Sequence, residues 1–476
     1  MNFEAVIGIE IHVEMKTKSK MFSSSPIAFG KEANTLVRPL DIAFPGTMPI
    51  VNKQAVINAI RVSNALNMEI DNELYFDRKN YFYSDLPKGF QITQDKRPIG
   101  KNGYVDVKLS DGNVKRIEIE RLHMEEDTCK QLHMADYTLL DYNRAGTPLI
   151  EIVSRPNIRN GEEAMRYVEA IKSIVVFSDV SDGKMEEGSL RCDVNISIRP
   201  CGSDKFGTKV EVKNLNSTAN VQRAIDFEIK RQTKLLLSGI NIEQETRRFD
   251  ELKKETVLMR KKTDSVDYKY FPEPNILPIR LSDEFVDEAI RTCPELASEK
   301  IARYMSASLS EEEANQMLQN KDMANYFDDC LKVNKNHAKQ YWNWLNGDIL
   351  AYLNKNELDI KQLAVSPSNL ENLINLLEKS VISFNQARTV FEKMAIDNKD
   401  ASLIADELGL KQNSNEEEIK EIVIATIEEF PQSVIDFKAG KDRAVGFLVG
   451  QIMKKTKGKV NPQITSKLVL EVLKSK

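Results

Sequence analysis

The chain has 476 residues, too many for a single compact core, so we expect two or three domains. It contains no secretory signal and no apolar run of the roughly 18 residues that a membrane span needs. Its five cysteines are scattered without a CxxC pair, which argues against a disulfide-rich secreted protein and predicts a cytoplasmic protein with reduced thiols.

The net charge of −5 is unevenly distributed along the chain. From Pro431 to Lys476 there are ten Lys or Arg and three Asp or Glu, so this segment carries +7 and the preceding chain carries −12. A basic tail on an acidic body is expected where the tail contacts a polyanion such as a nucleic acid. A solvated helical face would have the same composition, and charge alone does not separate the two interpretations.

Up to about Cys293 the sequence predicts short alternating strands with turns between them. The turns fall at Asp111–Gly112, Asp182–Gly183 and Gly202–Ser203. Helical patterns interrupt the strands at Val51–Met68, Glu162–Phe177 and Ser217–Leu237.

After Pro294 almost every pattern is helical. Ser310 with Glu313 forms a capping box, and Ser366–Pro367 is typical of a helix start. A polar stretch at Lys411–Asn415 predicts a further boundary. We therefore predict an α+β fold: an antiparallel-sheet cradle domain over 1–293, an all-helical domain over 294–410 and a small helical tail over 411–476.

The first predicted strand, Val6–Glu14, alternates between polar and apolar residues. Period two places Glu10, His12 and Glu14 on one face. Two carboxylates beside an imidazole are suitable ligands for Mg²⁺ or Mn²⁺, although the solvent side of an amphipathic strand would have the same pattern.

Further carboxylates follow along the chain. Glu125 belongs to the acidic run Glu125–Asp127, and Glu151 stands alone within the apolar run Leu149–Val153. A lone carboxylate in such a run is costly unless it is paired or binds a metal, so Glu151 is a candidate ligand or one partner of a structural ion pair.

The segment from Ser189 to Lys213 is the richest in polar residues. Its two predicted strands form a hairpin whose polar face carries Ser189, Arg191, Asp193, Asn195, Lys209, Glu211 and Lys213. Asp and Asn are disfavoured within strands, so this face indicates a function, and its Arg and Lys could neutralise the phosphates of a nucleotide.

Another segment, Asp77–Gln91, mixes basic and aromatic residues and includes Lys79. This composition suits a nucleic-acid or nucleotide surface, and equally an aromatic-rich turn packed on the core.

Taken together, several long stretches resemble one family in their order along the chain. They are IGIEIHVE, DRKNYFYSDLPKGFQITQ, RLHMEEDTCK, DYNRAGTPLIEIVS, KMEEGSLRCDVNISIRP, EVKNLNS, QETRRFDE, DYKYFPEPN and GFLVGQIMKKTKGKVNPQ. The family that they resemble is the B subunit of the glutaminyl/asparaginyl-tRNA amidotransferase, whose C-terminal tail is YqeY-like.

This resemblance implies an ATP- and Mg²⁺-dependent ligase that phosphorylates the side-chain carboxylate of Glu-tRNA(Gln) or Asp-tRNA(Asn). Ammonia then displaces the phosphate to give the amide. A partner amidase, the A subunit, would release the ammonia from glutamine, and a small C subunit would brace the heterotrimer. No phosphate loop and no amidase nucleophile are recognisable in the sequence, which agrees with this division of labour.

Carried onto this sequence, the resemblance implies a metal site at His12, Glu125 and Glu151. It places Glu10, Asp193 and Asn195 in the same pocket, and Lys79 with Glu125 where ammonia arrives. The implied tRNA contacts are Lys441, Arg443, Lys454, Lys455, Lys457 and Lys459. Two rival hypotheses remain: a stand-alone metal-dependent kinase or ligase for a small carboxylate, and a non-catalytic tRNA-binding assembly subunit.

Overall fold

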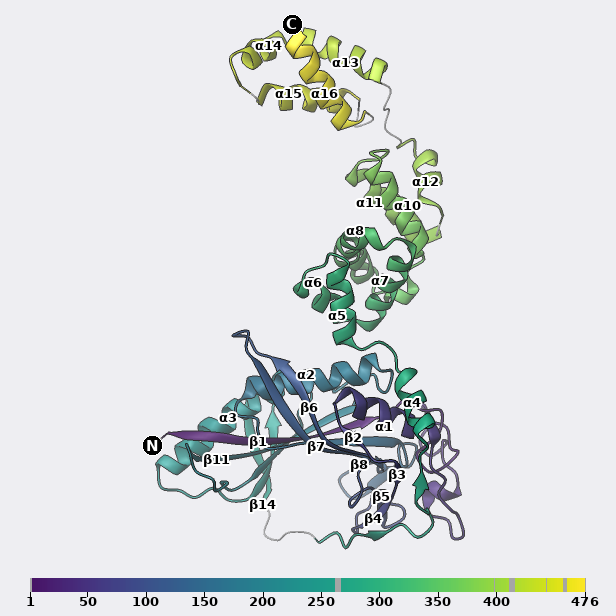
Figure 1. Ribbon diagram of the computed structural model, residues 1–476, viewed down its shortest axis with the longest axis vertical. Helices are drawn as coiled ribbons and strands as arrows, with labels where there is room; N and C mark the ends of the chain where they lie inside the picture. The colour runs from purple at the N-terminus through teal and green to yellow at the C-terminus, as the bar shows by residue number, and fades with distance from the viewer. Residues whose placement is uncertain are drawn as a thin grey trace. The chain divides into compact units, whose positions relative to one another are not determined.

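The computed structural model describes residues 2–261, 267–397, 399–410, 416–441, 443–456 and 460–475. The chain divides into two compact units, Met1–Ala297 and Ser298–Lys476 (Figure 1). The first unit combines a large sheet with helices and the second is helical, which confirms the predicted α+β class. The three predicted domains stay a prediction, because this division marks only one boundary.

A nine-stranded sheet forms the first unit. All its neighbouring strands are antiparallel except one parallel pair, β12 with β13. In spatial order the strands are β14 (Glu255–Lys261), β13 (Glu245–Asp250), β12 (Val210–Lys213), β11 (Leu190–Pro200), β1 (Phe3–Glu14), β10 (Pro148–Ser154), β7 (Val114–Glu126), β6 (Gly100–Lys108) and β2 (Glu69–Ile70).

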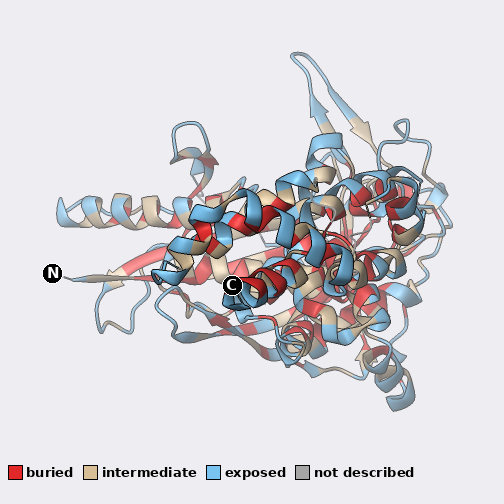
Figure 2. Cartoon of the chain, turned by 90° about the horizontal axis from the view of Figure 1, so that it is seen from above, coloured by how far each residue is buried: buried red, intermediate tan, exposed pale blue. Residues whose placement is uncertain are grey.

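Three helices cover one face of this sheet, as Figure 1 shows: α1 (Lys53–Ala65), α2 (Gly161–Phe177) and α3 (Thr218–Leu237). The core between them joins Ile9 and Ile11 of β1 to Ile60, Ile171 and Ile225 of the helices, all nearly inaccessible to solvent. Each such side chain contributes about 1.5–3 kcal/mol through burial, which offsets part of the conformational entropy lost on folding. Figure 2 shows helices of the chain with buried residues in red along one side and exposed residues in pale blue along the other.

The three predicted helices are confirmed, and so are the start and the end predicted for the third. Asn52, Asn160 and Ser217 cap their N-termini with side-chain oxygens, and Gly239, with φ +74°, follows the end of α3. The turn at Asp182–Gly183 was predicted to join two strands, which is wrong: it lies between α2 and β11. Asp-Gly favours a reversal of the chain but does not specify which elements flank it.

Smaller elements lie on the other side of the large sheet, below it in Figure 1. They are a three-stranded sheet of β15 (Phe271–Pro272), β4 (Asp77–Asn80) and β5 (Phe90–Thr93), a hairpin of β8 (Lys130–His133) and β9 (Thr138–Asp141), and the pair β3 (Glu73–Leu74) with β16 (Ile279–Arg280). The short helices η1 (Pro39–Ile42) and α4 (Asp283–Arg291) complete the unit.

From α5 onward the described chain is helical. Its α-helices are α5 (Ala297–Ser306), α6 (Glu311–Met317), α7 (Lys321–Val333), α8 (Ala338–Trp344), α9 (Leu350–Asn356), α10 (Pro367–Glu378), α11 (Phe384–Asp397), α12 (Ala401–Glu407), α13 (Glu416–Glu429), α14 (Pro431–Lys438), α15 (Arg443–Lys455) and α16 (Pro462–Ser475). Short turns of other helix types are η2 (Lys335–His337), η3 (Leu345–Ile349) and η4 (Ile360–Gln362).

The helix-start signals in the second unit are confirmed. Ser310 and Glu313 cap α6 reciprocally, and Ser366 caps α10 with Pro367 at its first position. The boundary predicted at Lys411–Asn415 lies outside the described residues. No helix in the described parts of the chain is both long enough and apolar enough to cross a membrane.

A buried ionic network attaches β13 and β14 to α3. Glu228 is fully buried and accepts hydrogen bonds from Arg231, at 2.9 Å, and from Thr256, while its Oε1 lies 3.3 Å from Nε of Arg247. Replacing Glu228 with alanine is expected to lower the free energy of unfolding by about 3 kcal/mol, because the two arginines lose their buried carboxylate. Urea denaturation measures this loss, and Lys230→Ala, an exposed change on the same helix, should stay within about 0.5 kcal/mol of the unmodified protein.

Candidate active site

The polar face of β1 lies on the side of the sheet away from the helices. Ile9, Ile11 and Val13 are buried in the core, whereas Glu10, His12 and Glu14 are intermediate in exposure, which confirms the predicted alternation. β1 is a central strand, so its polar side chains meet those of two neighbours. In the strand register, His12 lies opposite Glu151 of β10 and opposite Arg191 of β11.

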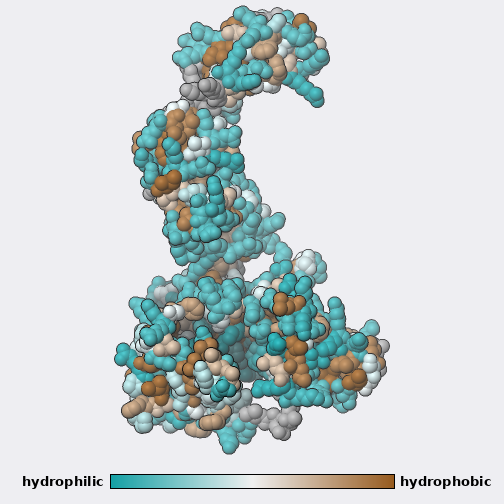
Figure 3. All heavy atoms as spheres, turned by 180° about the vertical axis from the view of Figure 1, so that it is seen from behind, coloured by the Kyte–Doolittle hydropathy of each residue, from teal (hydrophilic) through white to brown (hydrophobic). Residues whose placement is uncertain are grey.

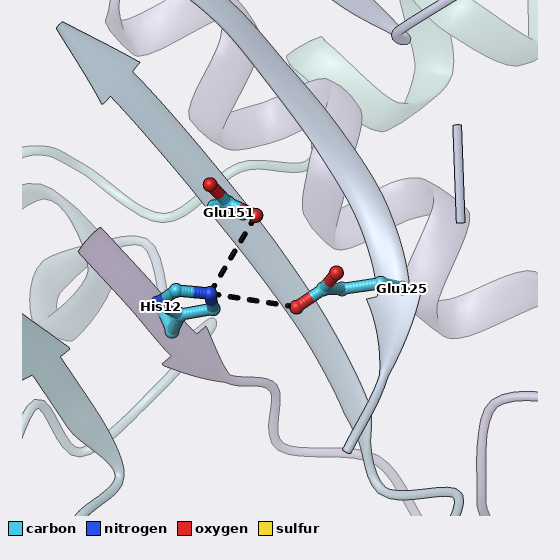
Figure 4. A group of neighbouring side chains, drawn as sticks. All are labelled: His12, Glu125 and Glu151. Carbon is cyan, nitrogen blue, oxygen red and sulfur yellow. Dashed lines mark ion pairs between the residues drawn. The ribbon is translucent and has the colours of Figure 1, made fainter. Parts of the chain in front are cut away.

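His12, Glu125 and Glu151 converge from three strands, β1, β7 and β10 (Figure 4). Nε2 of His12 lies 3.6 Å from Oε1 of Glu125 and 3.5 Å from Oε2 of Glu151. One ligand atom from each residue lies within 4.8 Å of the other two, the only such group of three or more metal-binding side chains in the described residues. The side chains are 23%, 4% and 13% exposed, respectively, so the group is sheltered but open to solvent at His12.

The donor set suits a hard divalent cation. Two carboxylates and one imidazole provide the oxygen ligands that Mg²⁺ prefers and a nitrogen ligand that Mn²⁺ readily accepts. With no thiolate among the donors, the group does not resemble a structural zinc site. The residues that the sequence predicted as ligands are therefore together in an arrangement able to bind a metal.

The charges within the group shift its ionisation. Burial lowers the pKa of His12, but the hydrogen bond to Glu151 and the charges of Glu151 and Glu125 more than offset it, so the pKa is raised. Burial acts to raise the pKa of Glu151, yet the charges of His123 and His12 hold it well below its ordinary value. Glu151 is thus an anion at neutral pH, as a metal ligand requires.

His123 is a neighbour that sequence reasoning missed. Its Nε2 lies 3.1 Å from Oε2 of Glu151 and 3.8 Å from Oε2 of Glu125, and its side chain is 7% exposed. Alternation could have found it, because His123 stands two residues before Glu125 and therefore on the same face of β7.

Glu10, Asp193 and Asn195 form a second group on the same face, shared by β1 and β11. Asp193 lies opposite Glu10, and Nδ2 of Asn195 donates to Oε1 of Glu10 at 2.9 Å. Burial raises the pKa of Glu10, and the charges of Glu151 and Asp193 act in the same direction. Nζ of Lys213 donates to Oδ2 of Asp193 at 2.5 Å, so a cation from β12 joins this acidic group.

Arg191 lies at the other end of the face. Its Nη2 donates to Oδ2 of Asp127 at 2.7 Å, and Nε of Arg144 lies 3.6 Å from the same oxygen. Burial raises the pKa of Glu14 to about 7, helped by the adjacent charge of Asp127. Glu14 belongs to the candidate metal-binding face of the first predicted strand, whereas Asp127 and Arg144 were not predicted as site residues. The contact of Asp127 with Arg191 joins residues 64 positions apart along the chain.

Three predicted residues are less closely joined to this face. The hydroxyl of Ser189 donates to Asp182 within its own turn, and Lys209 is exposed just before β12. Nζ of Lys79, on β4, lies 4.8 Å from the ring centre of Tyr268 and 5.7 Å from that of Tyr81.

The tail carries basic side chains on its surface, and most of its surface seen in Figure 3 is hydrophilic. Lys441, Arg443, Lys454 and Lys455 are exposed, while Leu448 and Ile452 of α15 pack into a separate apolar core. Lys441 pairs with Asp436 and Lys455 pairs with Glu429. The remaining predicted contacts, Lys457 and Lys459, lie outside the described residues.

Two family models match the chain. The GatB/GatE catalytic domain matches residues 5–287, which include the sheet and all the residues of its polar face. The chain belongs to the GatB family. The GatB domain that follows in this family matches residues 325–473.

Relatives from several bacteria are similar to this chain along nearly their whole length. The chain is 50% identical over 479 residues to the B subunit of the aspartyl/glutamyl-tRNA(Asn/Gln) amidotransferase of Bacillus velezensis. This alignment covers 100% of both chains. It is 48% identical over 478 residues to the protein of the same name from Bacillus pumilus, again covering 100% of both. The corresponding protein of Geobacillus thermodenitrificans is 49% identical over 473 residues, covering 99% of each chain. The family resemblance predicted from the sequence is confirmed.

Proposed function

We propose that this GatB chain is the amidating subunit of a tRNA-dependent amidotransferase, acting on Glu-tRNA(Gln), Asp-tRNA(Asn) or both. The observation that carries this proposal is the convergence of His12, Glu125 and Glu151 on the polar face of a sheet that matches the GatB catalytic domain. The names of its relatives, which specify aspartyl/glutamyl-tRNA(Asn/Gln) and a B subunit, support a tRNA substrate and a complex of several subunits.

The reaction has two steps. An oxygen of the substrate's side-chain carboxylate attacks the γ-phosphorus of ATP, and ADP leaves. The nitrogen of ammonia then attacks the activated carbonyl carbon, phosphate leaves, and the nitrogen loses a proton to give the amide. Phosphorylation is needed because a carboxylate oxygen is a poor leaving group.

His12, Glu125 and Glu151 would hold Mg²⁺ in this site. Bound there, Mg²⁺ would neutralise charge that develops on the transferring phosphoryl group. Arg191, Lys209 and Lys213 are the proposed phosphate contacts, and Ser189 is assigned to the same role with its hydroxyl first released from Asp182.

The second acidic group would orient these residues. Asp193 holds Lys213 at 2.5 Å, and Asn195 fixes Glu10 at 2.9 Å beside the metal ligands. Such hydrogen bonds restrict the rotamers of the groups that touch substrate, which keeps them in position before the reaction begins.

Ammonia would come from a partner amidase, the A subunit, with a small C subunit in the same complex. Lys79 and Glu125 are the proposed residues at the point where ammonia enters. A carboxylate there can take up the proton of an ammonium ion, so that the nitrogen arrives as a nucleophile.

The test is a reconstituted amidation reaction. The complex assembled with its partner subunits, ATP, Mg²⁺, ammonium and labelled Glu-tRNA is expected to form Gln-tRNA, and omission of ATP should stop it. If only Asp-tRNA is converted, the substrate is assigned to that class. Amidation of free glutamate without tRNA would favour the small-molecule ligase instead, and no conversion of any substrate would favour the non-catalytic assembly role.

A further inference from the structure

His123 stands on the polar face of β7 but is buried. The residues on either side of it, Leu122 and Met124, face the apolar core and are fully inaccessible to solvent. In the strand register His123 lies opposite Glu151, which in turn lies opposite His12. The row His123–Glu151–His12 therefore crosses three adjacent strands with the carboxylate between two imidazoles.

The two imidazoles approach the carboxylates differently. His12 lies nearest Oε1 of Glu125, at 3.6 Å, whereas His123 lies nearest Oε2 of Glu125, at 3.8 Å. His123 is closer still to Oε2 of Glu151, at 3.1 Å, a hydrogen-bond distance. It does not belong to the group whose ligand atoms all lie within 4.8 Å of one another, so it contacts the ligands from outside.

The second ring nitrogen of His123 lacks a hydrogen-bond partner in the described part of the chain, which costs folding free energy. Nδ1 of His123 is buried and has no hydrogen-bond partner among the residues that the structure describes. An unpaired buried polar atom destabilises the folded state, a cost that an apolar side chain of similar size would avoid. The presence of a histidine at this buried position is therefore best explained by the contacts that its Nε2 makes.

We propose that His123 is a positioning residue for the metal site, an inference that rests on the proposed function. By donating from Nε2 to Oε2 of Glu151, the oxygen that also lies 3.5 Å from His12, and by contacting Oε2 of Glu125, it holds both carboxylates in place. Oε1 of Glu125 then faces His12, and the two carboxylates stay together for a divalent cation. Partners of this kind orient metal ligands in many proteins, and their loss typically weakens metal binding by about 10–100-fold.

Manganese binding to the assembled complex tests this role, measured by the electron paramagnetic resonance signal of free Mn²⁺. The Mn²⁺ bound at this site is the portion that Glu151→Gln removes. His123→Leu is expected to raise its dissociation constant about 10–100-fold, whereas His123→Gln should stay within about threefold of the unmodified complex. The amide nitrogen of glutamine can take the place of Nε2, but that of asparagine, one methylene shorter, cannot, so His123→Asn should resemble the leucine variant.

His133→Leu is the matched control, because His133 is exposed on β8 and contacts Thr138 rather than the ligands. Amidation rates supply a second readout: loss of positioning should raise the Mg²⁺ concentration for half-maximal rate more than it lowers kcat. Thermal unfolding of each variant identifies any general loss of structure. If His123→Leu does not fold, the Mn²⁺ dissociation constants of His123→Gln and His123→Asn decide whether the proposal stands.

An unchanged dissociation constant for Mn²⁺ in His123→Leu would overturn the proposal. It would also be overturned if His123→Gln and His123→Asn weakened Mn²⁺ binding equally, because the ring would then serve packing only. If the unmodified complex binds no Mn²⁺ that Glu151→Gln removes, the metal site of the proposed function fails first. The two failures are therefore distinguishable.

Discussion

Replacing Glu151 with glutamine is expected to lower the rate of tRNA amidation by about 10³-fold at saturating ATP and tRNA, because it removes one of two anionic ligands from the site. Glutamine keeps the size of the side chain and can still accept hydrogen bonds from His12 and His123, so the fold should persist. Formation of amidated tRNA in the assembled complex measures the rate, and circular dichroism checks the fold.

Glu120→Gln provides the control for Glu151→Gln. Glu120 lies on β7 of the same sheet, but its side chain is 47% exposed and its nearest ionic partner is Arg121. This variant should retain the unmodified rate. His12→Ala should reproduce the loss seen with Glu151→Gln, and a rate within about threefold of the unmodified protein for both would leave the non-catalytic assembly hypothesis standing.

The charge of Glu151 also explains why one substitution should have so large an effect. Its pKa is held low mainly by the two histidines against the opposing effect of burial, so the group is an anion before any metal arrives. Neutralising it leaves Glu125 as the remaining carboxylate, with Oε1 toward His12 and Oε2 toward His123. The site then attracts a divalent cation less strongly.

Local pattern was sufficient to predict the faces of individual strands. Alternation in β1 placed Glu10 and His12 opposite the core residues Ile9 and Ile11, and the structure agrees. The capping residue Ser217 likewise marked the start of α3. Such signals are local because they depend on the side-chain direction and hydrogen bonds of a few consecutive residues.

The convergence of the site could not be worked out from spacing. The three candidate ligands meet because β1 pairs with β10 and β10 pairs with β7. The first of these pairings joins His12 to Glu151, which are more than 100 residues apart along the chain. The family resemblance, not periodicity, brought these residues together in the prediction. Ser189 illustrates the opposite case: its place in the alternating pattern was correct, but its hydroxyl donates to Asp182 in the adjoining turn.

A second large effect is expected in the tail. Replacing Arg443, Lys454 and Lys455 with glutamine should weaken tRNA binding by about 10²–10³-fold at 50 mM salt, because each phosphate contact adds nearly one unit to the slope of log K against log salt. The three side chains are exposed on α15, so the helix and its core of Leu448 and Ile452 should remain intact. Filter binding of labelled tRNA across a salt series gives both the affinity and the slope.

The salt dependence separates a tRNA contact from a general loss of positive charge. If the three side chains of the tail touch phosphates, the slope should fall by about three and the defect should shrink as salt rises, to about 10²-fold or less at 200 mM. Replacing the exposed Lys230, Lys253 and Lys254 of the first unit changes the net charge equally and should leave the slope unchanged. Amidation at saturating tRNA should also stay near its unmodified rate, because the tail binds the substrate but contributes no ligand to the metal. An unchanged slope in the tail variant would instead assign its basic residues to a solvated helical face, on which Lys455 pairs with Glu429.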